Sequence, residues 1–335
     1  MTNNLYHWLS NIDSLKFEDK SVLIMGAGWM ARQYAIALSK MKIKDVTVIS
    51  RTKEKADLLC KEFGFLTLDD NDKLIGKISR KDLTIIATPV QFLLPTAKLA
   101  LENGQDNILV EKPGSLYYPE MLSFNKSLTN QRVRIAYNRL VYPNLHMLKE
   151  LVEKEEGITS CNFSFTEWIH TIDFKKEYKE AYARWGITNS SHVITIVFDL
   201  IGMPKQFSFY QCGKLDWHQA GSVFVGSGLT ERKIPFSYHS NWESAGRWGI
   251  EVMTRDNAYR LIPLEELYVC PKGSTTWQKV PFKVAYPGVK QGIAEQIALM
   301  LDRQTENKIK LVSLEKAVGY NKAIEKIFGY NNQRF

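Results

Sequence analysis

The sequence predicts an α/β fold: an N-terminal doubly wound parallel sheet, followed by an α+β domain with a largely antiparallel sheet that helices cover on one face. Three observations indicate this. A short apolar run leads into a glycine-rich turn at 26–31. Strands then alternate with helices, which is typical of a parallel sheet with right-handed crossovers. Beyond about residue 143, strand-like runs follow one another with few helices between them, which favours antiparallel pairing.

The first part of the chain supplies the alternation. Residues 1–15 are expected to form a short helical extension, because apolar side chains fall on one helical stripe. The run 21–25 is continuous and apolar, as expected of a strand buried on both faces. The strands expected here are 21–25, 45–50, 65–68, 83–88, 107–111 and 133–137. The helices between them are expected at 30–40, 53–63, 92–103 and 118–128.

In the second part of the chain, strands no longer alternate regularly with helices. A helix at 144–155 is expected to lead into a strand at 159–168, with a further helix at 189–201. The later strands are expected at 207–212, 222–225, 233–240, 248–253, 258–263 and 267–270, and the closing helices at 289–301 and 314–328. The change of pattern divides the chain into two domains, residues 1–140, which include the short extension, and residues 141–335.

Composition bounds the class of protein. Hydrophobic residues make up 44% of the 335 residues and charged residues 24%, which is usual for globular proteins and excludes a disordered chain, a collagen-like repeat or a membrane bundle. The N-terminus does not resemble a signal peptide, and no run of 18 apolar residues occurs. We therefore expect a cytoplasmic protein with no membrane partner.

The charge and the cysteines give weaker evidence on which ligands and partners the protein has. The net charge of +8 comes from scattered lysines, which suits anionic small molecules and predicts no nucleic-acid partner. The four cysteines are far apart and have no histidine at zinc-like spacing, so we expect free thiols and no metal site.

The glycine turn carries the first functional signal. Residues 26–31 read Gly-Ala-Gly-Trp-Met-Ala, directly after a buried strand and at the start of a helix. In this context Gly26 allows the tight turn, Gly28 lets the backbone approach a pyrophosphate, and Ala31 lets the helix pack near the strand. The free N–H groups at the helix N-terminus favour the negative charge of a dinucleotide.

The end of the second strand indicates which dinucleotide binds. NAD-binding proteins usually place Asp or Glu there to hold the ribose hydroxyls. This chain has Ser50, Arg51 and Thr52 instead. A guanidinium at this point can stack on adenine and bind a 2′-phosphate in a forked hydrogen bond. We therefore expect NADP to be preferred, with NAD as the alternative cofactor.

Further motifs identify a family. Ala87-Thr88-Pro89 ends the fourth strand, Glu111-Lys112-Pro113 ends the fifth, Tyr137-Asn138-Arg139 ends the sixth, and His192 lies in the second domain. With the glycine turn, over roughly residues 21–328, these resemble the Gfo/Idh/MocA family, named for glucose–fructose oxidoreductase, inositol dehydrogenase and a rhizopine-catabolism protein. The resemblance implies a nicotinamide cofactor and a sugar-like substrate, possibly nucleotide-linked, bound between a Rossmann domain and an open-faced sheet domain.

The resemblance also implies catalytic residues. Lys112 would lie beside the reacting carbon, where a cation stabilises alkoxide charge and relays a proton. His192 would exchange a proton with a substrate hydroxyl. Relatives often carry Asp four residues before and three after this histidine; here those positions are Thr188 and Thr195. We therefore expect no carboxylate beside His192, with Asn189 as a hydrogen-bonding substitute.

The expected site residues are then as follows. Those expected to bind the cofactor are Gly26, Ala27, Gly28, Trp29, Met30, Ser50, Arg51, Thr52, Ala87, Thr88, Pro89, Glu111, Lys112 and Asn138. Those expected to bind substrate are Lys112, Arg139, Trp168, Trp185, Thr188, Asn189 and His192. Trp242 is a further candidate to stack on a sugar ring, and His170 and Arg184 are further candidates to bind hydroxyls or a phosphate.

Several alternatives stay open. A siderophore-type imine reductase would need a proton donor but no carboxylate. A catalytically degenerate NADP-binding protein would explain the lost Asp, although Lys112 and His192 argue against it. A glycosidase that uses tightly held NAD is a third alternative, and Arg51 argues against it. We also expect a homodimer or homotetramer packed through the open face of the second sheet, since a wide apolar face is unfavourable in water.

Overall fold

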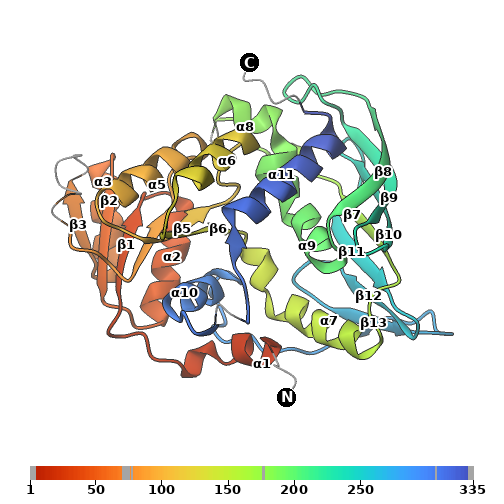
Figure 1. Cartoon of the computed structure of the whole chain (residues 1–335), viewed down its shortest axis with the longest axis horizontal. Helices are drawn as coiled ribbons and strands as arrows, with labels where there is room; N and C mark the ends of the chain where they lie inside the picture. The colour runs from red at the N-terminus through yellow and green to blue at the C-terminus, as the bar shows by residue number, and fades with distance from the viewer. Residues whose placement is uncertain (1–4, 70–75, 77, 176–177, 306–307, 331–335) are drawn as a thin grey trace. The chain divides into compact units, whose positions relative to one another are not determined.

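The computed structural model describes residues 5–69, 76, 78–175, 178–305 and 308–330, and the chain divides into two compact units, each built around its own sheet (Figure 1). Unit 1 comprises Met1–Ser115, Pro119–Val141 and Val284–Ala317. Unit 2 comprises Leu116–Tyr118, Tyr142–Lys283 and Val318–Phe335.

Unit 1 contains sheet A, whose strand order is β15-β6-β5-β4-β1-β2-β3. Its parallel strands are β1 (Ser21–Met25), β2 (Asp45–Ser50), β3 (Leu66–Asp69), β4 (Leu83–Ile86), β5 (Asn107–Glu111) and β6 (Arg132–Ala136), and β15 (Val312–Ser313) pairs antiparallel with β6. The crossover helices are α2 (Trp29–Lys40), α3 (Lys53–Phe63), α5 (Leu93–Glu102) and α6 (Tyr118–Ser127). The strand order reverses between β1 and β4, which confirms the predicted doubly wound sheet.

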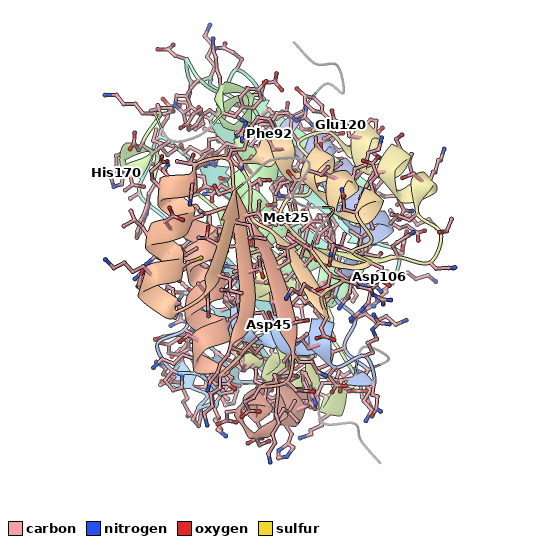
Figure 2. All side chains as sticks on the ribbon, turned by 90° about the vertical axis from the view of Figure 1, so that its left-hand side faces the viewer. Met25, Asp45, Phe92, Asp106, Glu120 and His170 are labelled. Carbon is pink, nitrogen blue, oxygen red and sulfur yellow. The ribbon has the colours of Figure 1, made fainter. Side chains whose placement is uncertain are left out.

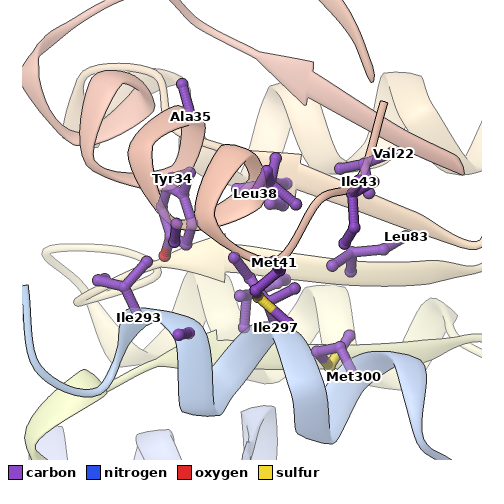
Figure 3. Packing of buried hydrophobic residues seen from close by; sticks show 14 of the residues in the cluster. Val22, Tyr34, Ala35, Leu38, Met41, Ile43, Leu83, Ile293, Ile297 and Met300 are labelled. Atoms are coloured by element: carbon purple, nitrogen blue, oxygen red, sulfur yellow. The ribbon is translucent and has the colours of Figure 1, made fainter. Parts of the chain in front are cut away.

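A late segment of the chain completes unit 1. Helix α10 (Ile293–Leu301) is buried along nearly its whole length and packs on α2. Figure 3 shows this contact, formed by Ile293, Ile297 and Met300 on one side and Tyr34, Leu38 and Met41 on the other. The Arg132 guanidinium fixes the end of α10 by donating to the carbonyls of Met300 and Leu299 at 2.6 and 2.9 Å. Residues 284–317 therefore return to the first sheet, a return that a single division at 140 does not include.

Unit 2 contains sheet B, in the order β14-β13-β12-β11-β7-β10-β9-β8. Its strands are β7 (Ser160–Phe165), β8 (Pro204–Cys212), β9 (Val223–Thr230), β10 (Pro235–Asn241), β11 (Trp248–Met253), β12 (Asn257–Leu261), β13 (Tyr268–Pro271) and β14 (Gln278–Lys279). Only the β7–β10 pair among these described strands is parallel, so the predicted mostly antiparallel sheet is confirmed.

Helices cover one face of sheet B. The helices of this part of the chain are α7 (Pro143–Lys154), α8 (Lys179–Ala183), α9 (Ser191–Ile201) and α11 (Leu314–Phe328). Aromatic contacts join them to the sheet: the rings of Phe163 and Phe198 lie 6.2 Å apart, and those of Phe165 and Phe328 lie 5.5 Å apart. Figure 1 shows α9 and α11 beside this sheet. The opposite face carries no such cover among the described helices of unit 2, as expected of an open-faced sheet.

Element boundaries differ from the predictions where distant contacts decide them. The expected N-terminal helix is α1 (Leu5–Ser10) with a 3₁₀ turn at Ile12–Ser14, and residues 1–4 lie outside the described residues. The closing helix α10 begins at Ile293 rather than at 289. The preceding Gly292 has φ +82°, and a Cβ there would lie 2.1 Å from the Asn138 carbonyl oxygen. The strands β14 and β15 were not predicted, because two residues are too few to show a strand pattern; β15 also pairs with the distant strand β6.

Two sequence-based expectations concern the surface. Cys60, Cys161 and Cys270 are buried and Cys212 is exposed, and all are free, as predicted. Among the residues that the structure describes, no helix is both long and apolar enough to cross a membrane.

Glu295, in the first turn of α10, makes the stability of unit 1 depend on pH. It is only 2% exposed, and burial raises the pKa of its carboxyl from 4.5 to about 7. Between these values the folded state holds a proton that the unfolded chain releases, so this contribution to stability falls as pH rises. We expect Glu295→Gln to become more stable relative to the native protein with rising pH, by up to about 1.4 kcal/mol per pH unit over this window.

Urea unfolding at pH values from 4.5 to 7 measures this difference. The exposed Glu231, changed to Gln, is the matched control and should show no such trend. A stability difference that stays constant across the window would contradict the assignment to Glu295.

Candidate functional site

The glycine turn joins β1 to α2 at the point where the strand order of sheet A reverses. Gly26 has φ +124°, and a Cβ at this position would lie 2.4 Å from the Ala87 carbonyl oxygen. The Gly26 amide donates to the Ile49 carbonyl, and the Ala87 amide donates to the Met25 carbonyl, both at 2.8 Å. These bonds hold the ends of β1, β2 and β4 together, and only glycine fits between them. Figure 2 shows Met25 at this end of the strands and Asp45 at the opposite end.

The second glycine of the turn faces open space. Gly28 is exposed and is the N-cap of α2, and a Cβ there would meet nothing within 4 Å. The first N–H groups of a helix point out of its N-terminus and suit a phosphate. The open space and the donors together have the chemistry that suits phosphate groups.

Arg51 lies beyond the end of β2 against an aromatic ring. Its guanidinium carbon is 4.2 Å from the centroid of the Phe92 ring, in the 3₁₀ turn Val90–Phe92 that follows β4. Ser50 Oγ accepts the Thr52 amide at 3.2 Å, which orders the turn that carries Arg51. Figure 2 shows Phe92 at the same end of the strands as Met25. Phe92 was not predicted as a site residue, since only the fold brings it to Arg51.

The Glu-Lys-Pro motif follows β5. Glu111 is buried, and the Tyr34 hydroxyl donates to its carboxylate at 2.6 Å. Burial raises the pKa of Glu111, while the bond from Tyr34 and the charge of Lys112 oppose that rise. The structure thus gives Glu111, expected to bind the cofactor, a bond that ties β5 to α2. Lys112 is half-buried, and the Lys112–Pro113 peptide is cis.

The returning segment adds a cation that sequence reasoning missed. Lys290 Nζ lies 5.0 Å from the ring centroid of Trp29, the first residue of α2, whose side chain is 64% exposed. Asn138, another expected cofactor ligand, is buried and donates to the Gln291 carbonyl at 2.9 Å. Its amide therefore holds the loop that carries Lys290.

The remaining cofactor candidates of unit 1 follow the carboxyl ends of the same parallel strands. Among them Ala27, Met30 and Thr88 are half-buried, and Pro89 is exposed. Arg139, a substrate candidate, is half-buried in the 3₁₀ turn Asn138–Val141 after β6.

His192 is the second residue of α9 in unit 2. It is 9% exposed, and its ring centroid lies 5.8 Å from that of Trp248 at the start of β11. A π-helical turn, Gly186–Ser190, precedes α9 directly. Such turns often occur at functional sites because they shift the side chains that follow.

A carboxylate lies at the start of this helix, so the expectation of none is wrong. Glu167, two residues after β7, accepts from Asn189 Nδ2 at 2.8 Å and from Ser190 Oγ at 2.6 Å. Arg247 Nη1 lies 3.5 Å from the same carboxylate. Burial raises the pKa of Glu167, and its bond from Ser190 and the charge of Arg247 oppose that rise. Asn189 is therefore a partner of the carboxylate rather than its substitute.

Among the other residues expected to bind substrate, one tryptophan is exposed, and the others contact neighbouring residues of unit 2. Trp168 is 48% exposed, whereas Trp242 is 1% exposed and belongs to the core. Trp185 stacks on Tyr182 with ring centroids 5.8 Å apart. The Thr188 hydroxyl donates to the Ala181 carbonyl at 3.1 Å.

Arg184 is also structural. It is 3% exposed and forms an ion pair with Glu325, which corrects its candidacy for binding a phosphate. Across the described ranges, no group of three or more His, Cys, Asp or Glu side chains is placed to hold a metal ion.

Part of unit 1 is similar in sequence to a known protein family. Residues 9–105 match the family described as shikimate/quinate 5-dehydrogenase. The chain is 27% identical over 167 residues to glutamyl-tRNA reductase of Saccharolobus solfataricus, covering 49% of this chain and 35% of that protein. It is 28% identical over 128 residues to the NADP(+) shikimate dehydrogenase of Nitrosopumilus maritimus, covering 37% and 46%. The chain thus matches less than half the length of these relatives.

Solved structures match nearly the whole chain. An oxidoreductase from Agrobacterium radiobacter in complex with NAD+, L-tartaric acid and magnesium has a TM-score of 0.76 at 13% identity, covering 93% of this chain and 96% of that one. A levoglucosan dehydrogenase in complex with NADH and L-sorbose has a TM-score of 0.73 at 15% identity, covering 93% and 96%. The UDP-N-acetylglucosamine 3-dehydrogenase of Acidithiobacillus ferrooxidans has a TM-score of 0.70 at 13% identity, covering 92% and 97%.

The fold is that of the Gfo/Idh/MocA-type oxidoreductases. The resemblance carried by the glycine turn and the Glu-Lys-Pro motif is thereby confirmed for the architecture of the chain. In this fold the two glycines of the turn have different roles. Gly26 allows close packing against Ala87, and Gly28 leaves open space at the N-terminus of α2.

A pair of substitutions distinguishes these tasks. Gly28→Ala should fold normally, because its φ of −85° suits alanine, but its methyl group should weaken dinucleotide binding about tenfold or more by displacing phosphate hydrogen bonds. Gly26→Ala should destabilise the fold by about 1–3 kcal/mol through the clash with Ala87. Thermal unfolding and a fluorescence titration with NADPH measure the two effects. If Gly28→Ala unfolds as early as Gly26→Ala, the division of tasks is wrong.

Proposed function

We propose that this protein is an oxidoreductase that prefers NADP and transfers a hydride to or from a carbonyl or alcohol carbon of a sugar-like substrate. The observation that carries the proposal is the glycine turn at the reversal of strand order. Gly28 leaves open space at the N-terminus of α2. Gly26 has no side chain and therefore lets the turn pack closely against Ala87, where a Cβ would clash. A dinucleotide is the ligand that this arrangement suits best.

Arg51 supports the choice of NADP. Its guanidinium carbon lies 4.2 Å from the centroid of the Phe92 ring, a cation–π contact that holds the group at the end of β2, and the N–H groups of a guanidinium suit a 2′-phosphate. The NADP(+) shikimate dehydrogenase among the relatives agrees with this choice. The solved levoglucosan dehydrogenase holds NADH, so the shared fold does not favour NADP over NAD. The proposed preference for NADP therefore rests on Arg51.

Lys112 and His192 are the proposed catalytic residues. When bound, the nicotinamide accepts or supplies the hydride. The Lys112 ammonium stabilises negative charge on the substrate oxygen and relays its proton. The Tyr34–Glu111 bond holds the strand end just before Lys112 in place. His192, as a neutral imidazole, takes up that same proton from the substrate oxygen or returns it, so that one hydride and one proton move in each turnover.

Glu167 supports an intact catalytic apparatus. The redox-inert alternative was motivated by the lack of a carboxylate on the helix of His192. Glu167, two residues after β7, brings a buried carboxylate to the start of that helix, where it accepts hydrogen bonds from Asn189 and Ser190.

The proposed substrate is a small molecule. Levoglucosan dehydrogenase and UDP-N-acetylglucosamine 3-dehydrogenase share this fold, which supports a sugar-like compound, including a nucleotide-linked sugar. The free thiols of unit 1 and unit 2 support work in the reducing cytoplasm.

Replacing Arg51 tests the cofactor preference. Arg51→Ala should weaken NADPH binding by about 1.5–3 kcal/mol, as expected for a charged hydrogen bond, and leave NADH binding nearly unchanged. Fluorescence titration of both cofactors measures this. Arg32→Ala removes an exposed, ion-paired arginine of α2 and should change neither affinity. Equal affinities of the native protein for NADPH and NADH would refute the preference.

Single-turnover hydride transfer tests the catalytic roles. General acid–base groups contribute roughly 10²–10⁴-fold, and we expect Lys112→Ala to lie near the top of that range. His192→Ala should lie near the bottom, because the oxygens of Glu167 are engaged by Asn189 and Ser190. Lys98→Ala, at an exposed position on α5, is the control.

The substrates for this test are sugars, ketones and cyclic imines. Transfer only to imines would favour the imine reductase, and NADPH binding without any transfer would favour the binding protein. Loss of transfer in His192→Ala with full transfer in Lys112→Ala would reverse the assigned roles.

We also propose a homodimer or homotetramer through sheet B. Two of its exposed apolar side chains, Tyr210 on β8 and Leu229 on β9, lie on the same face of the sheet and are 69% and 38% exposed. Light scattering at micromolar concentration should give a multiple of the 38.5 kDa chain mass. Tyr210→Glu should lower that mass, whereas Leu58→Glu, at an exposed site on α3, should not. A monomer mass for the native protein would contradict the proposal.

A further inference from the structure

The backbone amide that begins the π-helical turn before α9 is bonded to a side chain 144 residues away in the sequence. Gly186, the first residue of this turn, donates its N–H to the Tyr330 hydroxyl oxygen at 2.9 Å. The first N–H groups of a helix have no carbonyl partner within the helix. Tyr330 therefore satisfies one of these donors at the start of the segment that carries His192.

The end of α11 places this tyrosine. Gly329, directly after Phe328, has φ +64°, and its amide donates to the Lys326 carbonyl at 3.3 Å. The Tyr330 amide donates to the Glu325 carbonyl at 3.0 Å. These two bonds form a Schellman motif, which reverses the chain at the last turn of the helix. The Tyr330 ring stacks on the Phe328 ring, with centroids 5.3 Å apart and planes inclined by 8°.

Phe328 also packs directly against the start of the π turn. Its side chain is fully buried, and a Cβ at Gly186 would lie 2.4 Å from its Cε2 atom. The Arg184 guanidinium, which pairs with Glu325, lies 4.9 Å from the centroid of the Tyr330 ring. The end of α11 is thus in contact with the start of the π turn through a ring, a hydroxyl group and an ion pair.

The Tyr330 hydroxyl has a second partner, the imidazole of His218. This histidine is fully buried, and burial lowers its pKa from 6.5 to about 4, so the ring is neutral near pH 7. Its Nδ1 lies 2.7 Å from the Gly221 carbonyl oxygen, and its Nε2 lies 2.6 Å from the Tyr330 hydroxyl oxygen. A carbonyl oxygen can only accept, so Nδ1 carries the proton and Nε2 accepts the O–H of Tyr330.

The three hydrogen bonds therefore have a fixed direction. The Gly186 N–H donates to Tyr330, and the Tyr330 hydroxyl donates to His218. The His218 Nδ1–H donates in turn to Gly221. The imidazole lies among aromatic rings, with the Trp242 centroid 4.6 Å from its own. Removing the tyrosine hydroxyl would leave the Gly186 amide and the His218 Nε2 without these partners in a buried place, which is unfavourable.

The π turn connects this anchor to the proposed catalytic histidine. Its last two residues, Asn189 and Ser190, donate to the buried Glu167 carboxylate at 2.8 and 2.6 Å. The turn is thus bonded at its first residue to Tyr330 and at its last two to Glu167. A π turn closes bonds between residues i and i+5, so relaxing it to a regular α-helix would rotate the residues that follow, including His192.

We propose that Tyr330 and His218 are positioning residues for His192, and that they do so by holding the π turn in the form that sets the orientation of its imidazole. The inference rests on the proposed function, in which His192 exchanges a proton with the substrate. Both residues act through His192. No sequence motif indicated either of them.

Nuclear magnetic resonance of the full chain, with isotope-labelled histidine, tests the positioning without any substrate. The Cε1–H signal of His192 is the one that His192→Ala removes, and the Trp248 ring, 5.8 Å away between centroids, makes its chemical shift sensitive to orientation. Tyr330→Phe keeps the stacked ring and should shift this signal. Tyr259→Phe removes another buried tyrosine hydroxyl of unit 2, bonded to Glu155, and should leave the signal unchanged.

Single-turnover hydride transfer, with whichever sugar, ketone or cyclic imine reacts, measures the functional effect. Tyr330→Phe should slow transfer about tenfold, as misplaced catalytic groups do, and should leave NADPH affinity unchanged. In a His192→Ala background it should have no further effect, because the tyrosine acts through the imidazole. His218→Leu should behave as Tyr330→Phe. His218→Gln should retain most of the transfer, since its amide oxygen can accept the Tyr330 hydroxyl.

A His192 signal that does not move in Tyr330→Phe, or that moves as far in Tyr259→Phe, would overturn the proposal. So would a loss of transfer that multiplies with the loss in His192→Ala. If Tyr330→Phe does not fold, the pair His218→Leu and His218→Gln decides in its place, and equal signals in the two would count against the positioning. Absence of any hydride transfer by the native protein would refute the proposed function, while the resonance comparison would still decide the role of Tyr330.

Discussion

The close approach of two backbones at Gly26 is the constraint on which unit 1 depends. A side chain at this position would push against the Ala87 carbonyl at 2.4 Å, and the pairing of β1 with β4 would have to open. Because the strand order reverses there, the contact also directs the N-terminus of α2 toward the ends of the central strands. The positions of Gly28, Arg51 and Lys112 all follow from this arrangement, since each lies directly beyond one of these strand ends.

Most of unit 1 could be predicted because its signals are local. A buried strand, a glycine turn and an apolar helix face are each visible within a dozen residues, and the crossover rule then orders the strands. The return of residues 284–317 could not be predicted in the same way. The apolar character of α10 indicates burial but does not identify the surface that buries it. The bond from Asn138 to Gln291 joins positions 153 residues apart.

The candidate site in unit 2 shows the same limit more sharply. His192 was proposed from a motif, and the sequence analysis looked for a carboxylate only on the helix of His192 itself. Glu167 lies 22 residues before Asn189 and 80 before Arg247, and only the pairing of β7 with β11 brings these groups together. A usable signal was present: an acidic residue near the end of the strand predicted at 159–168 is costly to bury unless it has a partner. The arginine partner itself has no local signature.

The return of the chain to sheet A has a consequence for how the protein is made. During synthesis the N-terminal segment leaves the ribosome first and begins to fold in that order. The apolar side of α2 then waits for α10, which emerges only after nearly all of unit 2 has been translated. Unit 2 in turn needs residues beyond Ala317. Unit 1 therefore cannot complete its core before α10 is released, and the apolar side of α2 stays uncovered while the intervening part of unit 2 is translated.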